Sequence, residues 1–267
     1  MAANLTKSLP TIVAGAGIYT AVCIATYKYF ASSRADFQET ESMLQGGNYS
    51  FVDDPRRTER FQSVADTYDT QIGRDEKVMG INLMRRSLLY YHAKGTVLEV
   101  GAGTGRNIGF YPSSTVDRVL MSDASAEMLS KAKAKIKDQI ATYPKPQYAC
   151  MEADCQALDF PDNSFDTVVD TFGLCSYDDP AETLREMARV CKPEGKILLL
   201  EHGRSKTWDW ITNYLDKHAE RHAKNWGCVW NRDLDDIVKG SGLKVETLWT
   251  WHYGTTYYMV CRPNKSS

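Results

Sequence analysis

Residues 97–105, Val-Leu-Glu-Val-Gly-Ala-Gly-Thr-Gly, constrain the fold of this chain more than any other stretch. An apolar run that leads into closely spaced glycines is typical of a buried strand that turns into a helix, because glycine lets backbone N–H groups approach a ligand. Asp123 ends a second apolar run about 20 residues later, where an acid accepts hydrogen bonds from ribose hydroxyls. The pattern therefore predicts a nucleotide site rather than a plain strand-to-helix turn.

The glycine spacing separates two kinds of nucleotide site. Gly101, Gly103 and Gly105 form a GxGxG pattern, whereas the pyrophosphate fingerprint would need a glycine in place of Arg106. No Lys-Ser or Lys-Thr pair follows the glycines, so a P-loop is excluded too. A GxGxG turn preceded by an acidic strand residue, Glu99, resembles the class I S-adenosylmethionine-dependent methyltransferases.

That resemblance implies a binding site for S-adenosyl-L-methionine as co-substrate. In the family the turn packs against the amino-acid end of the cofactor, and acids after the second and third strands hold the ribose and the adenine amino group. Alternatives stay open at three positions: Asp154 as a helix N-cap, and Met128 and Tyr68 as core residues. The expected cofactor-binding residues are Tyr68, Glu99, Gly101, Gly103, Gly105, Asp123, Ala124, Met128, Asp154, Cys155 and Thr171.

Apolar runs and helix-like segments alternate along the chain, which predicts an α/β fold with a doubly wound, mostly parallel sheet of seven strands. Two β-rich runs joined at Tyr253-Gly254 predict a final antiparallel hairpin, as in the class I methyltransferases. Residues 54–93 and 210–224 have helical spacing, and Lys192–Gly195 reads as a turn. The expected strands are residues 97–100, 118–121, 147–151, 165–172, 197–200, 243–252 and 255–262.

The N-terminal segment reads as a separate element. Residues 9–27 carry no charged side chain, and as a helix they would span roughly 28 Å, close to the thickness of a bilayer core. We therefore expect a membrane anchor at residues 1–30, a polar linker at 31–53 and a methyltransferase domain at 54–267. A cleaved signal peptide and a buried soluble helix are the alternatives. Slightly more Lys and Arg after the segment than before it favours a domain on the cytosolic or matrix side.

Composition narrows the function further. The net charge of −2 does not suggest a nucleic-acid partner, and the 7 scattered cysteines indicate reduced thiols rather than a disulfide framework. His218 and His222 lie four residues apart, a spacing that can bind zinc, but no third ligand is evident. We therefore expect no metal site from the sequence. Four tryptophans between residues 208 and 230 form either a lid or membrane-contacting surface, or a satellite hydrophobic cluster.

Several further motifs resemble the fungal and protist mitochondrial inner-membrane methyltransferase-like family and, more distantly, the membrane-bound alkyl-thiol methyltransferases. The ubiquinone C-methyltransferases share the core but match less well. The resemblance implies a single-pass protein of the mitochondrial inner membrane, with the endoplasmic reticulum as the alternative. The motifs are Tyr68-Asp69, Gly80-Ile81, Arg85-Arg86, residues 103–107, 171–176 and 178–180, Leu200–Arg204, and residues 227–233.

We expect methyl transfer to a small lipophilic acceptor, a thiol, a quinone or a lipid. The reaction is an in-line displacement, so the protein mainly aligns the reactants and excludes water. His202, after the fifth strand, is the candidate base if the acceptor must lose a proton; a histidine bonded to backbone is the alternative. A second hypothesis is a non-catalytic membrane assembly protein, which the intact glycine turn, Asp123 and Asp154 disfavour.

Overall fold

The computed structural model describes residues 57–142 and 145–265 of the chain. The expected membrane anchor and the linker, residues 1–53, lie outside the described residues. Among the helices that are described, none is long and apolar enough to cross a bilayer.

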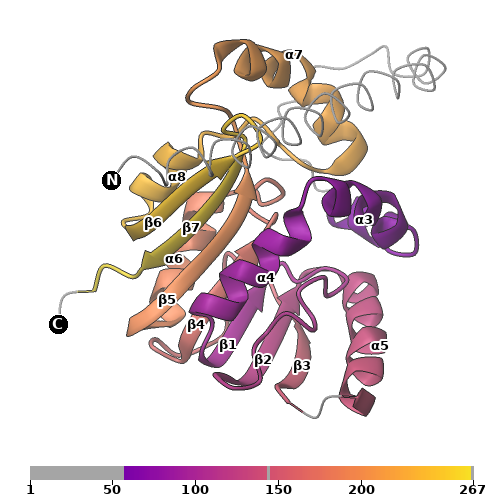
Figure 1. Ribbon diagram of the computed structural model, residues 1–267, viewed down its shortest axis with the longest axis vertical. Coiled ribbons are helices and arrows are strands. Elements are labelled where there is room, and N and C mark those ends of the chain that lie inside the picture. The colour runs from indigo at the N-terminus through magenta and orange to yellow at the C-terminus, as the bar shows by residue number, and fades with distance from the viewer. Residues whose placement is uncertain (1–56, 143–144, 266–267) are drawn as a thin grey trace, which may run out of the picture.

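One mixed sheet of seven strands forms the centre of the molecule, in the order β3-β2-β1-β4-β5-β7-β6 (Figure 1). β1 to β5 pair in parallel, and β7 is antiparallel to both of its neighbours, β5 and β6. The predicted doubly wound sheet and its C-terminal hairpin are therefore confirmed. The strands are β1 (Gly95–Val100), β2 (Val116–Asp123), β3 (Gln147–Glu152), β4 (Phe165–Thr171), β5 (Cys191–His202), β6 (Lys244–Trp251) and β7 (Thr256–Arg262).

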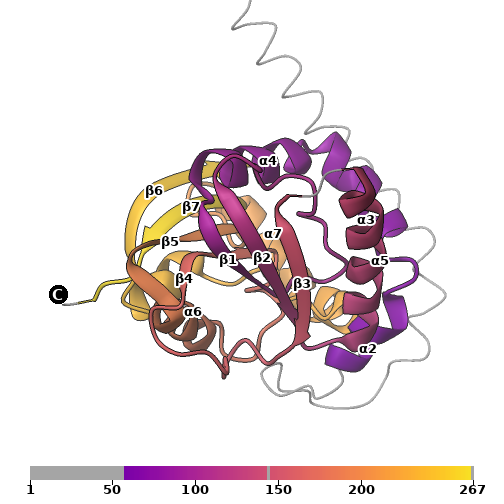
Figure 2. The same cartoon turned by 90° about the horizontal axis from the view of Figure 1, so that it is seen from below.

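Helices cover both faces of the sheet (Figure 2). The predicted helical region at residues 54–93 contains three helices, and Gly80, in the left-handed conformation with φ 72°, separates the last two. A residue without a Cβ adopts this conformation at little cost, which is why the chain breaks there. The helices are α2 (Arg57–Val64), α3 (Tyr68–Val78), α4 (Ile81–His92), α5 (Ala126–Thr142), α6 (Pro180–Val190), α7 (Asp209–Trp226) and α8 (Leu234–Gly240).

Two hydrophobic layers hold the helices to the sheet. On one face Leu88 and Leu89 of α4 pack with alternate strand residues, and Ala132 and Ile136 of α5 join them. On the other face α6 and α8 pack against the intervening strand residues through side chains such as Leu184. Each such buried Leu stabilises the fold by about 1.5–3 kcal/mol relative to an exposed one. Strand residues alternate between the two layers because successive side chains point to opposite faces.

β5 is longer than predicted. It begins at Cys191, and the Lys192–Gly195 segment that reads as a turn lies within it as an irregularity in the pairing with β4. Pro193 has no N–H to donate to the neighbouring strand, so the pairing register shifts there and the strand then continues. α8 was not predicted; its N-cap, Asp233, accepts a hydrogen bond from the Asp236 backbone.

The strand order reverses at β1, which pairs with β2 on one side and β4 on the other. In open parallel sheets such a switch point opens a crevice beyond the carboxyl ends of the strands. α7 follows β5 at that end of the sheet, and α3 lies near it in Figure 1. We therefore expect a binding site among the loops after β1, β2, β3 and β4.

Candidate active site

A cavity of about 310 Å³ lies at this switch point. Loops after β1, β2, β3 and β4 line it, together with Phe61 of α2, Tyr68 of α3 and Arg85 of α4. Of the predicted cofactor-binding residues, all but Gly105 line this cavity. The fold therefore brings the predicted residues together around one cavity. The contact that each of them makes with the cofactor stays a prediction.

The glycine turn has the conformation that the sequence implied. Gly101, Gly103 and Gly105 have φ values of 56°, 55° and 77°, a region that side chains with a Cβ rarely adopt. A Cβ on Gly105 would lie 2.5 Å from Cδ1 of Ile108 and 3.2 Å from Cβ of Ala132 in α5. Gly105 therefore serves close packing of the turn on the helix, which explains why it does not line the cavity.

Asp123 links the turn to the end of β2. Its carboxylate accepts hydrogen bonds from the backbone N–H groups of Gly103 (2.7 Å) and Ser125 (2.9 Å). Ser125 in turn accepts from the Met128 backbone (3.2 Å) and so caps α5. Burial raises the pKa of Asp123 although the two N–H groups lower it. The carboxylate is held at the cavity wall, as a ribose-binding acid requires.

The residues after β3 form a turn rather than a helix start. Asp154 accepts a hydrogen bond from the Gln156 backbone (2.9 Å). Among the described residues no helix begins between β3 and α6, so Asp154 is not a helix N-cap. Cys155 lies 3.7 Å from Oγ1 of Thr183, and burial raises the pKa of its thiol to about 12. This thiol is therefore protonated at neutral pH.

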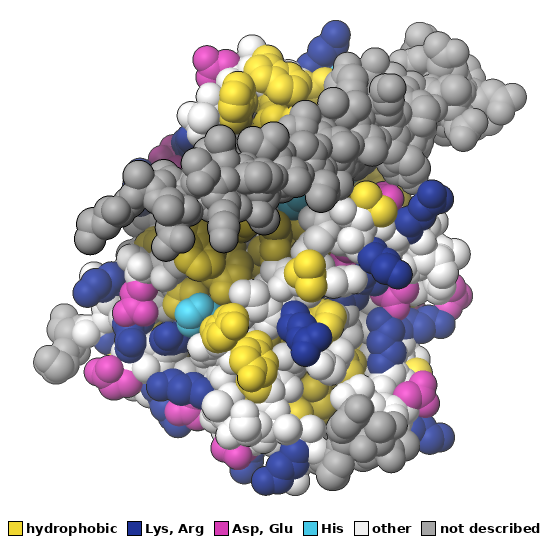
Figure 3. All heavy atoms as spheres, in the orientation of Figure 1, with side chains coloured by type: hydrophobic (Ala, Val, Ile, Leu, Met, Phe, Trp, Pro, Cys, Tyr) yellow, Lys and Arg dark blue, Asp and Glu magenta, His cyan; other side chains and the backbone are white. Residues whose placement is uncertain are grey.

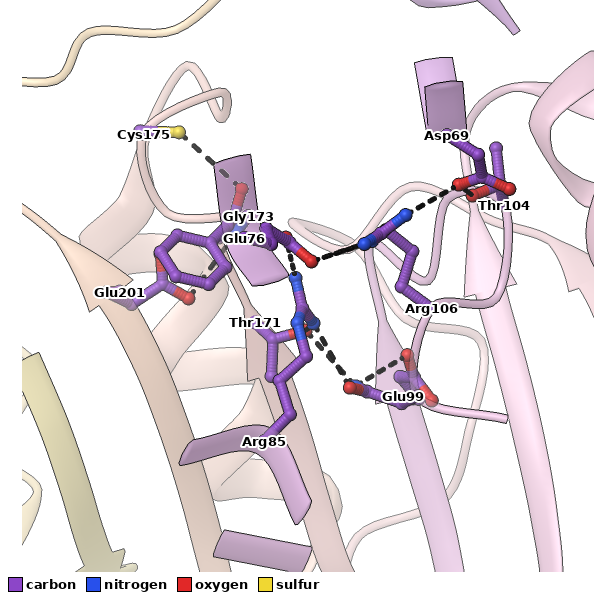
Figure 4. A network of polar contacts seen from close by, with 12 residues as sticks. Asp69, Glu76, Arg85, Glu99, Thr104, Arg106, Thr171, Gly173, Cys175 and Glu201 are labelled. Carbon is purple, nitrogen blue, oxygen red and sulfur yellow. Dashed lines mark hydrogen bonds and ion pairs between the residues drawn. The ribbon is translucent and has the colours of Figure 1, made fainter. Parts of the chain in front are cut away.

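Glu99 is the buried centre of a polar network (Figure 4). Tyr111 donates to Oε2 of Glu99 (2.6 Å) and Asn107 donates to Oε1 (3.0 Å). Burial raises the pKa of Glu99 to about 7 against the effect of these donors. Arg85 donates to Asn107 (3.1 Å) and to Thr171 (2.5 Å), and so joins the ends of β1 and β4.

Ion pairs continue the network to α3. Glu76 accepts from Arg85 (2.8 Å) and from Nε of Arg106 (2.9 Å), while Asp69 pairs with Arg106 (3.1 Å) and accepts from Thr104 (2.7 Å). Figure 4 shows Arg106 reaching between Asp69 and Glu76. These contacts hold α3, and with it Tyr68, over the glycine turn.

Tyr68 is partly buried and lines the cavity, and its ring packs edge-on against Phe61 at 6.5 Å. Burial raises the pKa of its hydroxyl. The alternative of a core tyrosine is thus disfavoured by position. Met128 is buried yet borders the cavity, so both of its proposed roles are compatible with its place.

Several cavity residues were not assigned from the sequence. Phe61, Arg85, Arg106 and Tyr177 all line the cavity. Arg85 and Arg106 belong to the motifs quoted above, and for Arg85 the available signal was an arginine among apolar helix positions. Tyr177 had none, because only the fold places its hydroxyl 2.2 Å from where a Cβ of Gly101 would lie.

His202 does not line the cavity. It lies at the end of β5 with its ring 5.5 Å from that of Phe172, and Nε2 is 2.9 Å from Sγ of Cys228. Burial lowers and the neighbouring Cys175 raises the pKa of His202, with a net upward shift. The predicted alternative was a ring that bonds to the backbone; the ring of His202 instead contacts thiols.

The tryptophan-rich segment divides into two parts. Trp208 and Trp210 are exposed at the start of α7 and each packs edge-on against Tyr253 at 6.1 Å. Figure 3 shows hydrophobic side chains gathered over this helix at the top of the molecule. Trp230 instead stacks on His222 at 3.9 Å and forms a satellite cluster. Burial lowers the pKa of His222 to about 4.

Residues 98–199 match a family model described as a methyltransferase domain. Mitochondrial methyltransferase OMS1 of Saccharomyces cerevisiae is 34% identical over 77% of this chain and 46% of that protein. The ubiquinone/menaquinone biosynthesis C-methyltransferase UbiE of Shewanella woodyi is 33% identical over 66% of this chain and 70% of its own length. The chain belongs to the class I S-adenosylmethionine-dependent methyltransferases. S-adenosylmethionine is the co-substrate of this family.

Two further similarities complete the comparison. A phosphatidylethanolamine N-methyltransferase of Cereibacter sphaeroides is 36% identical over 44% of this chain and 56% of that protein. An S-adenosylmethionine-dependent methyltransferase of Leishmania major shares the fold, with a TM-score of 0.59 and 15% identity over 80% of this chain and 87% of that one. The chain spans about half the length of two of these relatives, OMS1 and the phosphatidylethanolamine enzyme.

Proposed function

We propose that this chain is a membrane-anchored methyltransferase that transfers the methyl group of S-adenosylmethionine to a small, lipophilic acceptor. The observation that supports it best is the cavity at the switch point, where the glycine turn and Asp123 meet an aromatic wall. Polar groups on one side and Phe61, Tyr68 and Phe172 on the other suit a charged cofactor beside an apolar acceptor.

The cofactor would lie along the strand ends. Gly101 and Gly103 leave room for its amino-acid end, Asp123 accepts from its ribose, and Asp154 with Cys155 borders its adenine. Because the sulfonium supplies the leaving group, alignment and exclusion of water are the contributions required of the protein. Thr171 and Phe172 then border the place where the methyl group leaves.

The acceptor class is inferred from the names of two relatives. One name refers to ubiquinone/menaquinone biosynthesis and the other to phosphatidylethanolamine. Both concern lipophilic molecules that reside in membranes. A thiol of similar apolar character is the third candidate acceptor.

Membrane attachment is proposed on two grounds. Residues 9–27 have the length and apolarity of an anchor, and Trp208 and Trp210 present exposed rings of the kind that favours membrane interfaces. The mitochondrial inner membrane is the proposed site, since OMS1 is a mitochondrial protein. The endoplasmic reticulum is the alternative.

His202 is the candidate base, and it contacts Phe172 of the cavity wall rather than the cavity itself. Replacing it with alanine should lower turnover by about 10²-fold or more if it takes a proton in the transition state. The affinity for S-adenosylhomocysteine should stay unchanged, because His202 does not line the cavity. Unchanged turnover would remove His202 from the mechanism.

The function is tested by methyl transfer from labelled S-adenosylmethionine, with the full chain in vesicles that contain a quinone, phosphatidylethanolamine or an alkyl thiol. We expect label in one acceptor class and none with the Asp123→Ala variant. A chain that binds the cofactor yet labels none of these acceptors would contradict the proposal and favour the non-catalytic assembly role.

A further inference from the structure

Three side chains with soft ligand atoms meet beside the cavity. Cys175 follows β4, His202 ends β5, and Cys228 follows α7. Their sulfur and nitrogen atoms all lie within 4.8 Å of one another. Within residues 57–142 and 145–265 this is the one such grouping of three or more Cys, His, Asp or Glu side chains.

The fold holds the three residues in place through backbone contacts. Val229 donates a backbone hydrogen bond to the carbonyl of Cys175 (2.8 Å), which joins the loop after β4 to the loop after α7. Gly227 ends α7 in the left-handed conformation, so the chain turns at once into Cys228. Cys175 and Cys228 are 2% and 7% exposed.

The grouping fits a thiophilic cation. Zinc binds thiolate sulfur at about 2.3 Å and imidazole nitrogen at about 2.0–2.1 Å, so its ligand atoms lie about 3.5–3.8 Å apart in a tetrahedral site. The observed limit of 4.8 Å requires only small side-chain adjustments. The 2.9 Å contact between His202 and Cys228 must open by about 0.6 Å to reach that spacing.

The cluster adjoins the cavity wall. Phe172, Ser176 and Tyr177, on both sides of Cys175, line the cavity. Phe61 also lines it, and its ring lies 3.3 Å from where a Cβ of Gly227, next to Cys228, would stand. An ion here would therefore tie together the three segments that support this side of the cavity.

We propose that Cys175, His202 and Cys228 bind a thiophilic divalent cation, with Zn²⁺ as the reference ion. Binding requires both sulfurs as thiolates and His202 as the neutral imidazole, so the protons that these three groups hold go to solvent, and the two thiolates neutralise the dipositive ion. Two cysteines and one histidine leave a fourth position for water or another donor, as in zinc sites with three protein ligands. The inference does not depend on which acceptor is methylated, but an imidazole bound to the ion would not serve as the base considered above.

Sequence reasoning missed this grouping because the ligands have no short spacing. The expectation of no metal rested on His218 and His222, which are engaged elsewhere: His222 stacks on Trp230 and the ring of His218 lies 4.6 Å from that of Tyr214. A site assembled from three distant segments becomes visible only in the fold.

The test uses the full chain, reduced and stripped of metal. Zn²⁺ is titrated against a chromophoric chelator, and Co²⁺ is added separately to record thiolate-to-cobalt absorption. We expect about one ion per chain with thiolate absorption, because three ligands from one cluster hold one ion. Cys175→Ser and Cys228→Ser should each weaken Zn²⁺ binding by at least about 100-fold, since loss of an outer partner alone costs about 10–100-fold.

Two matched variants sharpen the test. Cys150→Ser changes a thiol on β3 outside the cluster and should bind Zn²⁺ like the wild type. His202→Cys keeps a ligand but removes the imidazole, so retained Zn²⁺ binding with this variant separates ligation from proton transfer. Circular dichroism and S-adenosylhomocysteine binding report whether each variant is folded.

Three results would overturn the proposal. One is a folded, reduced wild type that takes up neither ion. Another is uptake that survives the combined Cys175→Ser and Cys228→Ser substitutions. A third is a Cys175–Cys228 disulfide whose reduction restores both thiols without metal uptake, which would assign the pair to redox chemistry instead.

Discussion

Glu99 is a buried carboxyl in the polar network that supports the cavity. It is 2% exposed, with Tyr111 and Asn107 as hydrogen-bond donors, at the point where β1 enters the glycine turn. Arg85 lies one residue further along the network and supplies the positive charge that this buried acid needs. These hydrogen-bonded polar pairs join residues that are far apart in the sequence, so local sequence patterns do not predict them.

The raised pKa of Glu99 predicts a pH-dependent stability. Burial raises this pKa from 4.5 to about 7, so the folded state keeps the proton where the unfolded state has lost it. The stabilising contribution is full below pH 4.5 and is lost as the pH rises through about 7. Glu99→Gln should therefore flatten the decline of the unfolding free energy over this range. Urea unfolding at several pH values measures it; an unchanged slope would contradict the assignment.

Arg85 and Arg86 form a matched pair for mutation. Arg85 is buried and pairs with Glu76, whereas Arg86 is exposed. Arg85→Met should lower the unfolding free energy by about 1–3 kcal/mol, because Asn107 and Thr171 lose a buried donor while Glu76 keeps Arg106 as its partner. Arg86→Met should change it by less than about 0.5 kcal/mol. Equal effects in chemical denaturation would show that the network does not stabilise the fold.

At the scale of elements, the glycine turn and α5 act as one unit. A Cβ on Gly105 would lie 3.2 Å from Cβ of Ala132 in α5, while a Cβ on Gly103 would meet nothing within 4 Å. Gly105→Ala should therefore cost about 1–3 kcal/mol for overpacking in addition to the about 1–2 kcal/mol of the left-handed conformation, which Gly103→Ala alone would incur.

The same pair of variants should separate stability from binding. Gly103 lines the cavity. Gly103→Ala should therefore lose more free energy of S-adenosylhomocysteine binding than free energy of unfolding. Thermal unfolding and calorimetry on both variants measure the two quantities. A larger loss of stability in Gly103→Ala than in Gly105→Ala would contradict the packing argument.

The element pattern was predictable where periodicity and turn residues agree. The hairpin around Tyr253-Gly254 and the strand before Gly101 have both signals, and both are confirmed. Lys192–Gly195 has turn residues but lies inside β5, because pairing with β4 continues past the irregularity. α8 is too short for a periodic signal, and only its packing on α6 makes it a helix.

At the scale of the whole molecule, sequence reasoning identified residues that line the cavity but not the residues that support them. Asp123 and Asp154 were identified because each lies at or just after the end of a strand that can be recognised in the sequence. Glu76, Arg106 and the Cys175 cluster act through partners on other elements, and tertiary contacts are not encoded in local spacing. The membrane anchor remains a prediction, since residues 9–27 lie outside the described residues.

Calorimetric titration of the full chain with S-adenosylhomocysteine tests the central claim most directly. We expect stoichiometric binding that weakens by about 10–100-fold in Asp123→Ala, since hydrogen bonds to a charged group contribute about 1.5–3 kcal/mol. Asp123→Asn, which keeps the size of the side chain, should show an intermediate loss. A folded chain that binds no S-adenosylhomocysteine, or binds it equally well without the Asp123 carboxylate, would contradict the assigned site.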